Sequence, residues 1–268
     1  MRLIRLELKS VSFEYIDEIA AESNSGDLLE LINLSFGVGK VTDNGFQLID
    51  RLRDSRPMKR SLSRLMRDQA SRDLIERREL VKPYNHDELM NLPTGTLGRV
   101  FAEVCRAMNY DINFYPSPEY FHNLETPADY VNYRVLATHD IHHIVTGFAL
   151  NSAGEVGVIS VSVEQFGFPG YVIIDISSLL KNWLTAEKPY IDIEDDLERA
   201  RTGREKWKCI TRGMEMGEGA ALLFPIDWHA LMHKDLNLVR EELGITPVTK
   251  GISSWYDNPE IVAAINRV

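Results

Sequence analysis

Three histidines and one aspartate fall within five consecutive positions of the segment "THDIHHIVTGF" (138–148). A helix turns by about 100° per residue, so His139 and His143 would lie one turn apart on the same face. Two imidazoles at this spacing can bind one metal ion, as in the helical H-E-x-x-H arrangement. Asp140 would lie about 60° from His143 and could join them, whereas His142 would lie about 100° from His143 and point away.

A fourth candidate ligand, Glu155, follows the turn "NSAG" (151–154) and could begin a second helix that returns past the first. Two histidines and two carboxylates suit Zn²⁺, and the same set would accept Fe²⁺, Mn²⁺ or Co²⁺. The competing interpretation is an ordinary helix face, with Asp140 in an ion pair and Glu155 favoured by its helix N-terminus. The residues alone leave both interpretations open.

A second pair of histidines, His229 and His233, is also spaced by four, in "DWHALMHKD" (227–235). It lies in a short stretch after Pro225, and its spacing identifies no distant ligand. We interpret this pair as part of an exposed helix, and the sequence does not decide whether it binds anything.

The elements that must position these residues are predicted to be helices, because apolar side chains recur at intervals of three and four. Thr96 is a plausible N-cap, Pro127 suits a first helical position, and Gly147 and Gly244 are expected to end helices. A strand is the alternative for parts of the Val/Ile-rich stretch 155–184. The expected helices cover 27–38, 42–55, 59–78, 93–110, 126–148, 155–167, 197–223 and 235–245.

This pattern predicts an all-α fold, a single-domain helical bundle over residues 1–268, with at most a small β element that periodicity does not place. Residues 1–90 form a helical N-terminal part, 91–246 the core with the histidine motif, and 247–268 a C-terminal tail. A chain of 268 residues can bury a substantial core.

Composition narrows the classes of function. The net charge of −10 and the pI of about 5.2 argue against a nucleic-acid-binding protein, which needs a basic face. Only Cys105 and Cys209 are present, which favours a reducing compartment. We find no signal peptide and no apolar run long enough to span a bilayer, so a cytoplasmic or peripheral protein is expected. The basic segment 51–78 is either a solvated helix face or a surface for anionic lipid headgroups.

The spacing H-D-x-x-H-x₁₁-E of His139, Asp140, His143 and Glu155 resembles the signature of the coenzyme Q (ubiquinone) biosynthesis protein 4 family. The flanking segments resemble that family in the same order, so the resemblance covers roughly residues 90–246. These segments are "LPTGTLGRVFAEV" (92–104), "YVNYRVLATHDIHHIVTGF" (130–148), "GEVGVISVSVEQFGFP" (154–169), "GMEMGEGAALLFPIDW" (213–228) and "LNLVREELGI" (236–245).

The resemblance implies a mostly helical fold and a divalent metal, zinc in the first place with Fe²⁺ or another ion as the alternative. It also implies that the four motif residues are the ligands. The sequence departs from the family pattern at His142 inside the motif, in the His229/His233 pair, and at Leu136, where a basic residue is common. The last departure puts an anion-binding role near the motif in doubt.

Two functions are compatible with this resemblance. The first is a zinc-dependent carboxy-lyase that removes the C1 carboxylate of a polyprenylated 4-hydroxybenzoate-type precursor, by simple or oxidative decarboxylation with hydroxylation. Glu164 is a weak candidate proton donor, because an ideal helix places it about 180° from Glu155. The second is a non-catalytic lipid-binding organiser that presents prenylated quinone intermediates to a membrane-associated biosynthetic complex.

Both functions require an apolar groove or tunnel for the prenyl tail. Helical stripes supply candidate lining residues, although such stripes are more often simply core. The expected partners are the polyprenylated aromatic precursor, other ubiquinone-biosynthesis proteins, the cytoplasmic face of the inner membrane as a peripheral surface, and a second copy in a homodimer. The candidate lining residues are Leu97, Phe101, Val104, Ile144 and Phe148.

Overall fold

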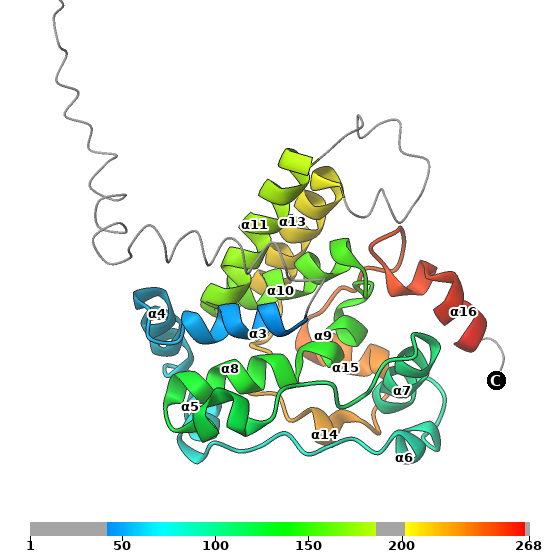
Figure 1. Cartoon of the computed structure of the whole chain (residues 1–268). Coiled ribbons are helices and arrows are strands. Elements are labelled where there is room, and N and C mark those ends of the chain that lie inside the picture. Colours follow the sequence, from blue (N-terminus) through cyan, green and yellow to red (C-terminus); the bar gives the residue numbers. More distant parts are fainter. Residues whose placement is uncertain (1–41, 186–201, 266–268) are drawn as a thin grey trace, which may run out of the picture.

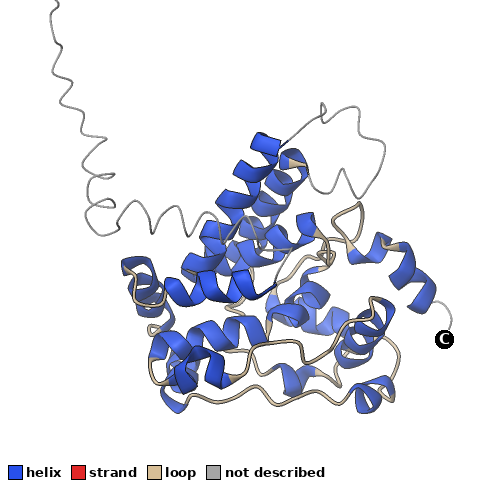
Figure 2. Cartoon of the chain, in the orientation of Figure 1, coloured by secondary structure: helices blue, strands red, loops and turns tan. Residues whose placement is uncertain are grey.

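The computed structural model describes residues 42–185 and 202–265, and within these ranges helices are joined by turns and loops (Figures 1 and 2). The described residues form no strand, and their only β-type pairings are isolated bridges from Thr96 to Asp235 and from Phe148 to Ser254. The predicted all-α class is confirmed. The predicted helix at 27–38 and the first residues of the one at 197–223 lie outside the described residues.

The described helices differ widely in length. In chain order they are α3 (Thr42–Arg51), α4 (Arg56–Leu65), α5 (Gln69–Arg77), α6 (His86–Met90), α7 (Leu97–Ala107), the 3₁₀ segment η1 (Pro118–Leu124), α8 (Pro127–Ala137), α9 (His139–Thr146), α10 (Ser152–Phe166), α11 (Pro169–Thr185), α13 (Gly203–Gly219), α14 (Trp228–Leu231), α15 (Leu236–Leu243), the 3₁₀ segment η3 (Trp255–Asp257) and α16 (Pro259–Ile265).

Two predicted long helices are each divided in the structure. The segment 59–78 belongs to α4 and α5, because Asp68 caps a new helix by accepting a hydrogen bond from the Ser71 amide at 2.7 Å. The segment 126–148 breaks at Thr138, whose hydroxyl donates to the Arg134 carbonyl at 2.9 Å. A carboxylate or hydroxyl that bonds locally to the backbone competes with helix continuation, so both single-helix predictions were wrong.

The predicted ends of these segments are confirmed. Thr126 caps α8 in a reciprocal capping box with Asp129, and Pro127 is the first helical residue. Gly147 ends α9 with φ of 81°, a left-handed conformation that favours glycine. Thr96 caps α7 and Gly244 ends α15 in the same predicted way.

Helix α10 lies in the middle of the bundle, in contact with α9, α11 and α13 (Figure 1). It is buried around most of its circumference, which explains a Val/Ile-rich run without clear amphipathic spacing. The strand alternative for this stretch is therefore wrong. Gly157 of α10 and Gly213 of α13 allow the two helix backbones to approach closely, because a methyl group on Gly213 would overlap the Gly157 carbonyl oxygen.

The five side chains predicted to line a prenyl groove all belong to the central core. Each has at most 1% of its surface exposed, and each packs against other buried apolar residues. In this structure they contribute core packing, and a lipid groove stays a prediction. The residues are Leu97, Phe101, Val104, Ile144 and Phe148.

The contact between α10 and α13 yields a stability prediction. Gly213→Ala should lower the free energy of unfolding by about 1–3 kcal/mol, because the added methyl group must push the helices apart. Gly219→Ala is the matched control, since a methyl group there meets nothing within 4 Å. Urea unfolding followed by circular dichroism measures both variants, and equal stability of the two would contradict this packing.

Candidate metal centre

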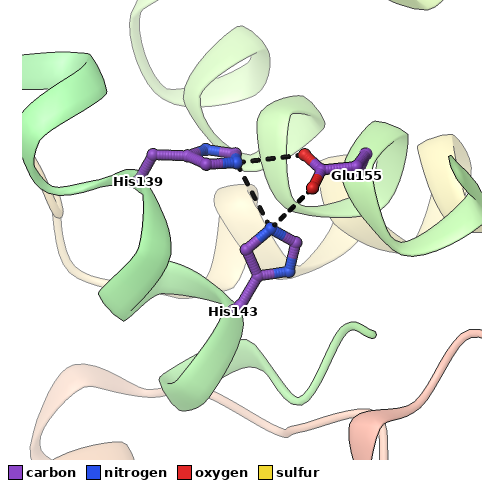
Figure 3. A group of neighbouring side chains, drawn as sticks. All are labelled: His139, His143 and Glu155. Atoms are coloured by element: carbon purple, nitrogen blue, oxygen red, sulfur yellow. Dashed lines mark hydrogen bonds and ion pairs between the residues drawn. The ribbon is translucent and has the colours of Figure 1, made fainter. Parts of the chain in front are cut away.

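His139 and His143 on α9 point toward Glu155 in the first turn of α10 (Figure 3). His139 Nε2 lies 3.0 Å from Glu155 Oε2 and 3.2 Å from His143 Nε2. His143 Nε2 lies 3.3 Å from Glu155 Oε1. The i,i+4 pair and the glutamate beyond the turn thus come together as their spacing predicts.

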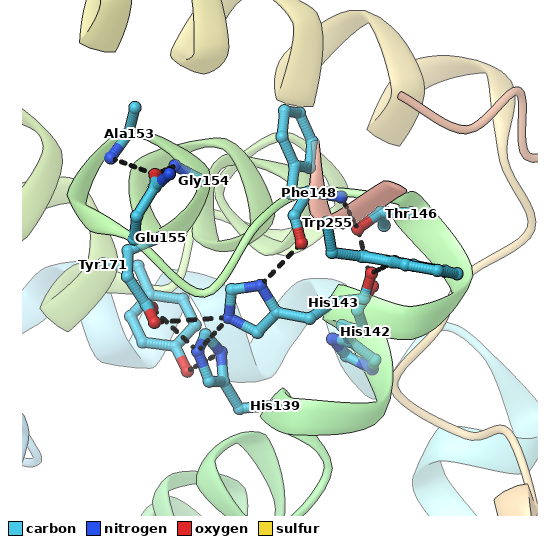
Figure 4. A network of polar contacts seen from close by, with 11 residues as sticks. His139, His142, His143, Thr146, Phe148, Ala153, Gly154, Glu155, Tyr171 and Trp255 are labelled. Carbon is cyan, nitrogen blue, oxygen red and sulfur yellow. Dashed lines mark hydrogen bonds and ion pairs between the residues drawn. The ribbon is translucent and has the colours of Figure 1, made fainter. Parts of the chain in front are cut away.

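The turn between α9 and α10 determines the position of Glu155 (Figure 4). Asn151 caps α10 by accepting hydrogen bonds from the amides of Ala153 and Gly154 at 3.1 and 3.0 Å. Gly154 lies so close to the Ala149 backbone that no side chain would fit there. Glu155 consequently occupies the first helical turn, where the partial positive charge of the helix favours a carboxylate.

A hydrogen bond to the backbone fixes the orientation of the His143 ring. Its Nδ1 donates to the Phe148 carbonyl at 3.1 Å, which leaves the Nε2 lone pair directed at His139 and Glu155 (Figure 4). Metal-bound histidines typically donate their second ring nitrogen in this way. The His143 side chain is 1% exposed, so the arrangement is built into the core.

The last carbonyl groups of α9 are also satisfied by side chains from the C-terminal region. Trp255 Nε1 donates to the His143 carbonyl at 3.0 Å. Arg240 donates from Nη2 to the Ile144 carbonyl at 2.7 Å and from Nε to the Val145 carbonyl at 2.8 Å. These bonds supply the partners that the end of a buried helix otherwise lacks, and they hold α9 in place.

The three donor atoms fit a divalent metal. A tetrahedral ion with bonds of about 2.0–2.1 Å has ligand atoms about 3.3 Å apart, and the three distances here are 3.0, 3.2 and 3.3 Å. The His143 lone pair also faces a carboxylate oxygen, a contact that is favourable only with a proton or a cation between them. Three protein ligands leave one tetrahedral position free for a further ligand.

The charges at the site are strongly coupled. Burial acts to raise the pKa of Glu155, but the neighbouring His143 and His139 hold it well below its usual value. Burial acts to lower the pKa of His139, but the hydrogen bond and charge of Glu155 raise it. The Glu155 side chain is 47% exposed and His139 is 17% exposed, so the cluster opens to solvent on the glutamate side.

The two remaining residues of the motif segment lie differently. Asp140 contributes no oxygen to the group of donors that lie within 4.8 Å of one another, which contains only His139, His143 and Glu155. It nevertheless interacts with both histidines, and burial raises its pKa to about 6 against their opposing influence. Its role as fourth ligand stays a prediction. His142 packs edge-on against Trp228 with ring centroids 5.5 Å apart, outside this donor group.

The other sequence-predicted residues lie elsewhere. Glu164 follows Glu155 by two and a half helical turns, which places it about 13 Å further along α10 on the opposite side. It is exposed and its Cβ adjoins Gly217 of α13, so the structure does not bring it to the cluster. His229 is half-buried, stacks on Tyr84 at 4.2 Å and contacts the Lys82 carbonyl at 2.7 Å, whereas His233 is exposed. His233 lies in the turn that follows α14 and His229 is half-buried, so the interpretation of the pair as part of an exposed helix is wrong.

Sequence reasoning missed the residues that support the ligands from a distance. The Tyr171 hydroxyl on α11 lies 3.5 Å from His139 Nδ1, and burial raises the pKa of this tyrosine. Tyr171, Arg240 and Trp255 are far from the motif in the chain, and no local pattern indicates them. The cap at Asn151 was detectable, because asparagine before a helix is a common N-cap.

The coupled charges predict how the metal-free protein responds to pH. The lowered pKa of Glu155 contributes stability that is complete above about pH 4.5 and is lost as the pH falls. The raised pKa of His139 contributes stability that is complete below about pH 6.5 and is lost as the pH rises. In thermal unfolding of chelator-treated protein, Glu155→Gln should therefore lower Tm most between these pH values. A difference that keeps growing above pH 8 would contradict the assigned pair.

Bound metal should also be lost as the pH falls. Ligands must lose their protons to bind, so metal retention should fall as pH drops below about 6.5. Equilibrium dialysis at stepped pH, with metal measured by elemental mass spectrometry, tests this expectation. Retention that is constant down to pH 4 would contradict a site made of these two histidines and one carboxylate.

Comparison with known proteins places this geometry in a family. The chain is 25% identical over 229 residues to the mitochondrial ubiquinone biosynthesis protein coq-4 of Caenorhabditis elegans, covering 85% of this chain and 86% of that protein. It is 28% identical over 189 residues to the mitochondrial COQ4 protein of Eremothecium gossypii, covering 69% of this chain and 53% of that protein.

A solved structure shows the same fold. The crystal structure of a Nostoc punctiforme protein, described as a ubiquinone biosynthesis protein, superposes with a TM-score of 0.67 at 25% identity, covering 83% of this chain and 98% of that one. Residues 52–249 match the family described as coenzyme Q (ubiquinone) biosynthesis protein Coq4, and they include all four motif residues. The chain therefore belongs to the Coq4 family of coenzyme Q (ubiquinone) biosynthesis proteins.

Proposed function

We propose that, within ubiquinone biosynthesis, this chain is a metal-dependent decarboxylase acting at C1 of a polyprenylated 4-hydroxybenzoate-type precursor. The observation that carries the proposal is the convergence of His139, His143 and Glu155 at the spacing of tetrahedral ligands. A site with three protein ligands retains a position for substrate, whereas a purely structural zinc is closed by four protein ligands. Asp140 is the proposed fourth ligand in the alternative, closed arrangement.

The residues around the cluster have distinct tasks in this reaction. A bound divalent ion, zinc in the first place, supplies Lewis acidity toward a substrate oxygen. His143 is held by the Phe148 carbonyl and Tyr171 lies beside His139, so both imidazoles keep their direction. The exposed side of Glu155 leaves the cluster accessible to a carboxylate headgroup.

Loss of CO₂ breaks the bond to C1, leaves its electron pair on the ring, and requires a proton at C1. Asp140 is better placed than Glu164 to deliver this proton, because it lies beside the histidines, whereas Glu164 lies on the far side of α10. In the oxidative version, one atom of dioxygen would bond to C1 as CO₂ leaves and the other would be reduced to water. The two electrons would come either from an external reductant, which gives the hydroquinone, or from the ring, which gives the quinone. This version would need a redox-active ion such as Fe²⁺, since zinc has no redox chemistry.

The partners and location of the chain are part of the proposal. The described residues contain no helix that is long and apolar enough to cross a bilayer. A prenylated substrate calls for a peripheral position at a membrane, next to other ubiquinone-biosynthesis proteins, and we propose a homodimer. Two relatives are named as mitochondrial proteins, so the comparisons do not support the cytoplasmic location expected from the sequence.

Metal content provides the first test. His139→Ala/His143→Ala should lose one equivalent of zinc or iron relative to the unmodified protein, as measured by elemental mass spectrometry after purification without chelators. His86→Ala/His233→Ala, which removes two histidines outside the cluster, should lose none of that equivalent. Equal metal content in both variants, with the helical circular dichroism retained, would contradict a metal at this cluster.

Turnover provides the second test. Release of labelled CO₂ from a carboxyl-labelled prenylated 4-hydroxybenzoate should fall by at least about tenfold in Glu155→Gln, because a ligand is lost. Glu164→Gln should retain activity, since this side chain lies on the far side of α10. If Glu155→Gln keeps turnover, the decarboxylase proposal is wrong. If it loses the fold together with the metal, the ion is structural and the lipid-presenting alternative gains support.

A further inference from the structure

We propose a second divalent-cation site, formed by Asp50, His122 and Asp129, that is separate from the metal centre on α9 and α10. Asp50 lies on α3, His122 on η1 and Asp129 at the start of α8. Helices α3 and α8 are in contact and run side by side (Figure 1). The site joins α3 to the consecutive segments η1 and α8, which lie far from it in the sequence.

The donor atoms are within reach of one ion. His122 Nε2 lies 3.0 Å from Asp50 Oδ1, and one donor atom from each of the three residues lies within 4.8 Å of the other two. The His122 and Asp50 side chains are 43% and 31% exposed. An ion could therefore arrive from solvent and complete its coordination with water molecules.

Asp129 supplies the observation that points to a cation. Its Oδ2 accepts hydrogen bonds from the Thr126 amide and hydroxyl at 2.9 and 2.7 Å. Its Oδ1 is buried, has no hydrogen-bond partner, and belongs to a side chain that is only 1% exposed. A buried charged oxygen without such a partner is costly, and a directly bound cation would offset that cost.

Arg53 forms an ion pair with this oxygen. Its Nη1 lies 3.6 Å from Asp129 Oδ1, an ion pair beyond hydrogen-bond distance, whereas its Nε donates to Asp54 Oδ2 at 3.1 Å. The Asp54 side chain is 82% exposed, so Arg53 can keep this partner while it moves away from Asp129. Arg53 would thus compete with an ion without blocking it.

The chemistry of the donors selects the ion. One imidazole and two carboxylates suit Zn²⁺ or Mn²⁺ better than Ca²⁺ or Mg²⁺, because Ca²⁺ and Mg²⁺ prefer oxygen ligands only. Ile49, next to Asp50, packs against Gly170, the neighbour of Tyr171. An ion here would hold α3 against the helix whose tyrosine lies beside His139.

Zinc titration of the full-length protein against a chromophoric chelator tests the site. The unmodified protein should show two classes of site, and His122→Ala should weaken only one of them, by at least about tenfold. Arg53→Gln should tighten that same class by about fivefold, because a neighbouring positive charge is removed. His86→Ala is the matched control: His86 adjoins Asp87 but belongs to no three-donor group among the described residues, so both classes should persist.

The remaining outcomes separate this site from the proposed metal centre. His139→Ala/His143→Ala should abolish the other class and leave the His122-dependent class intact. Two results would overturn the second site. In the first, His122→Ala leaves zinc binding unchanged. In the second, the protein shows a single class of zinc site, which only the His139→Ala/His143→Ala variant removes. Either result would show that Asp50 and His122 form an ion pair only.

Discussion

The hydrogen bond from His143 Nδ1 to the Phe148 carbonyl is the contact on which the site depends. This hydrogen bond joins the last turn of α9 to the residue that follows Gly147. The His143 ring therefore keeps its orientation only if the turn after α9 brings the Phe148 carbonyl to Nδ1. Val248 donates to the Thr146 carbonyl at 2.8 Å, and Trp255 to the Gly147 carbonyl at 3.1 Å. Segments distant in the chain thus determine where the histidine lone pair points.

This dependence assigns a structural role to the C-terminal residues. Residues 247–268 were expected to form a tail, yet Val248 and Trp255 are buried and donate to backbone carbonyls at the end of α9. The hydroxyl of the buried Ser254 donates to the Val248 carbonyl. Arg240 is 3% exposed and donates to two α9 carbonyls. The candidate metal ligands come from two short segments, but their positions rely on residues much later in the chain.

Local chemistry explains which features the sequence could predict. The caps at Thr96 and Thr126, the stops at Gly147 and Gly244, and the convergence of His139, His143 and Glu155 depend on neighbouring residues and helix periodicity. The break at Thr138 depends on a hydroxyl that can either face solvent or bond back to Arg134. The positions of Asp140, Tyr171 and the Asp50–His122–Asp129 group depend on helix packing, for which one sequence carries no direct signal.

X-ray absorption at the metal edge of the full-length protein carrying His122→Ala, which weakens the second proposed site, tests the central claim most directly. We expect about two imidazole nitrogens at about 2.0–2.1 Å together with oxygen ligands, and no sulfur, because His139, His143 and Glu155 offer only nitrogen and oxygen. Both cysteines, Cys105 and Cys209, are buried and free. A sulfur shell near 2.3 Å, or a metal surrounded by oxygen alone, would contradict the site described for α9 and α10.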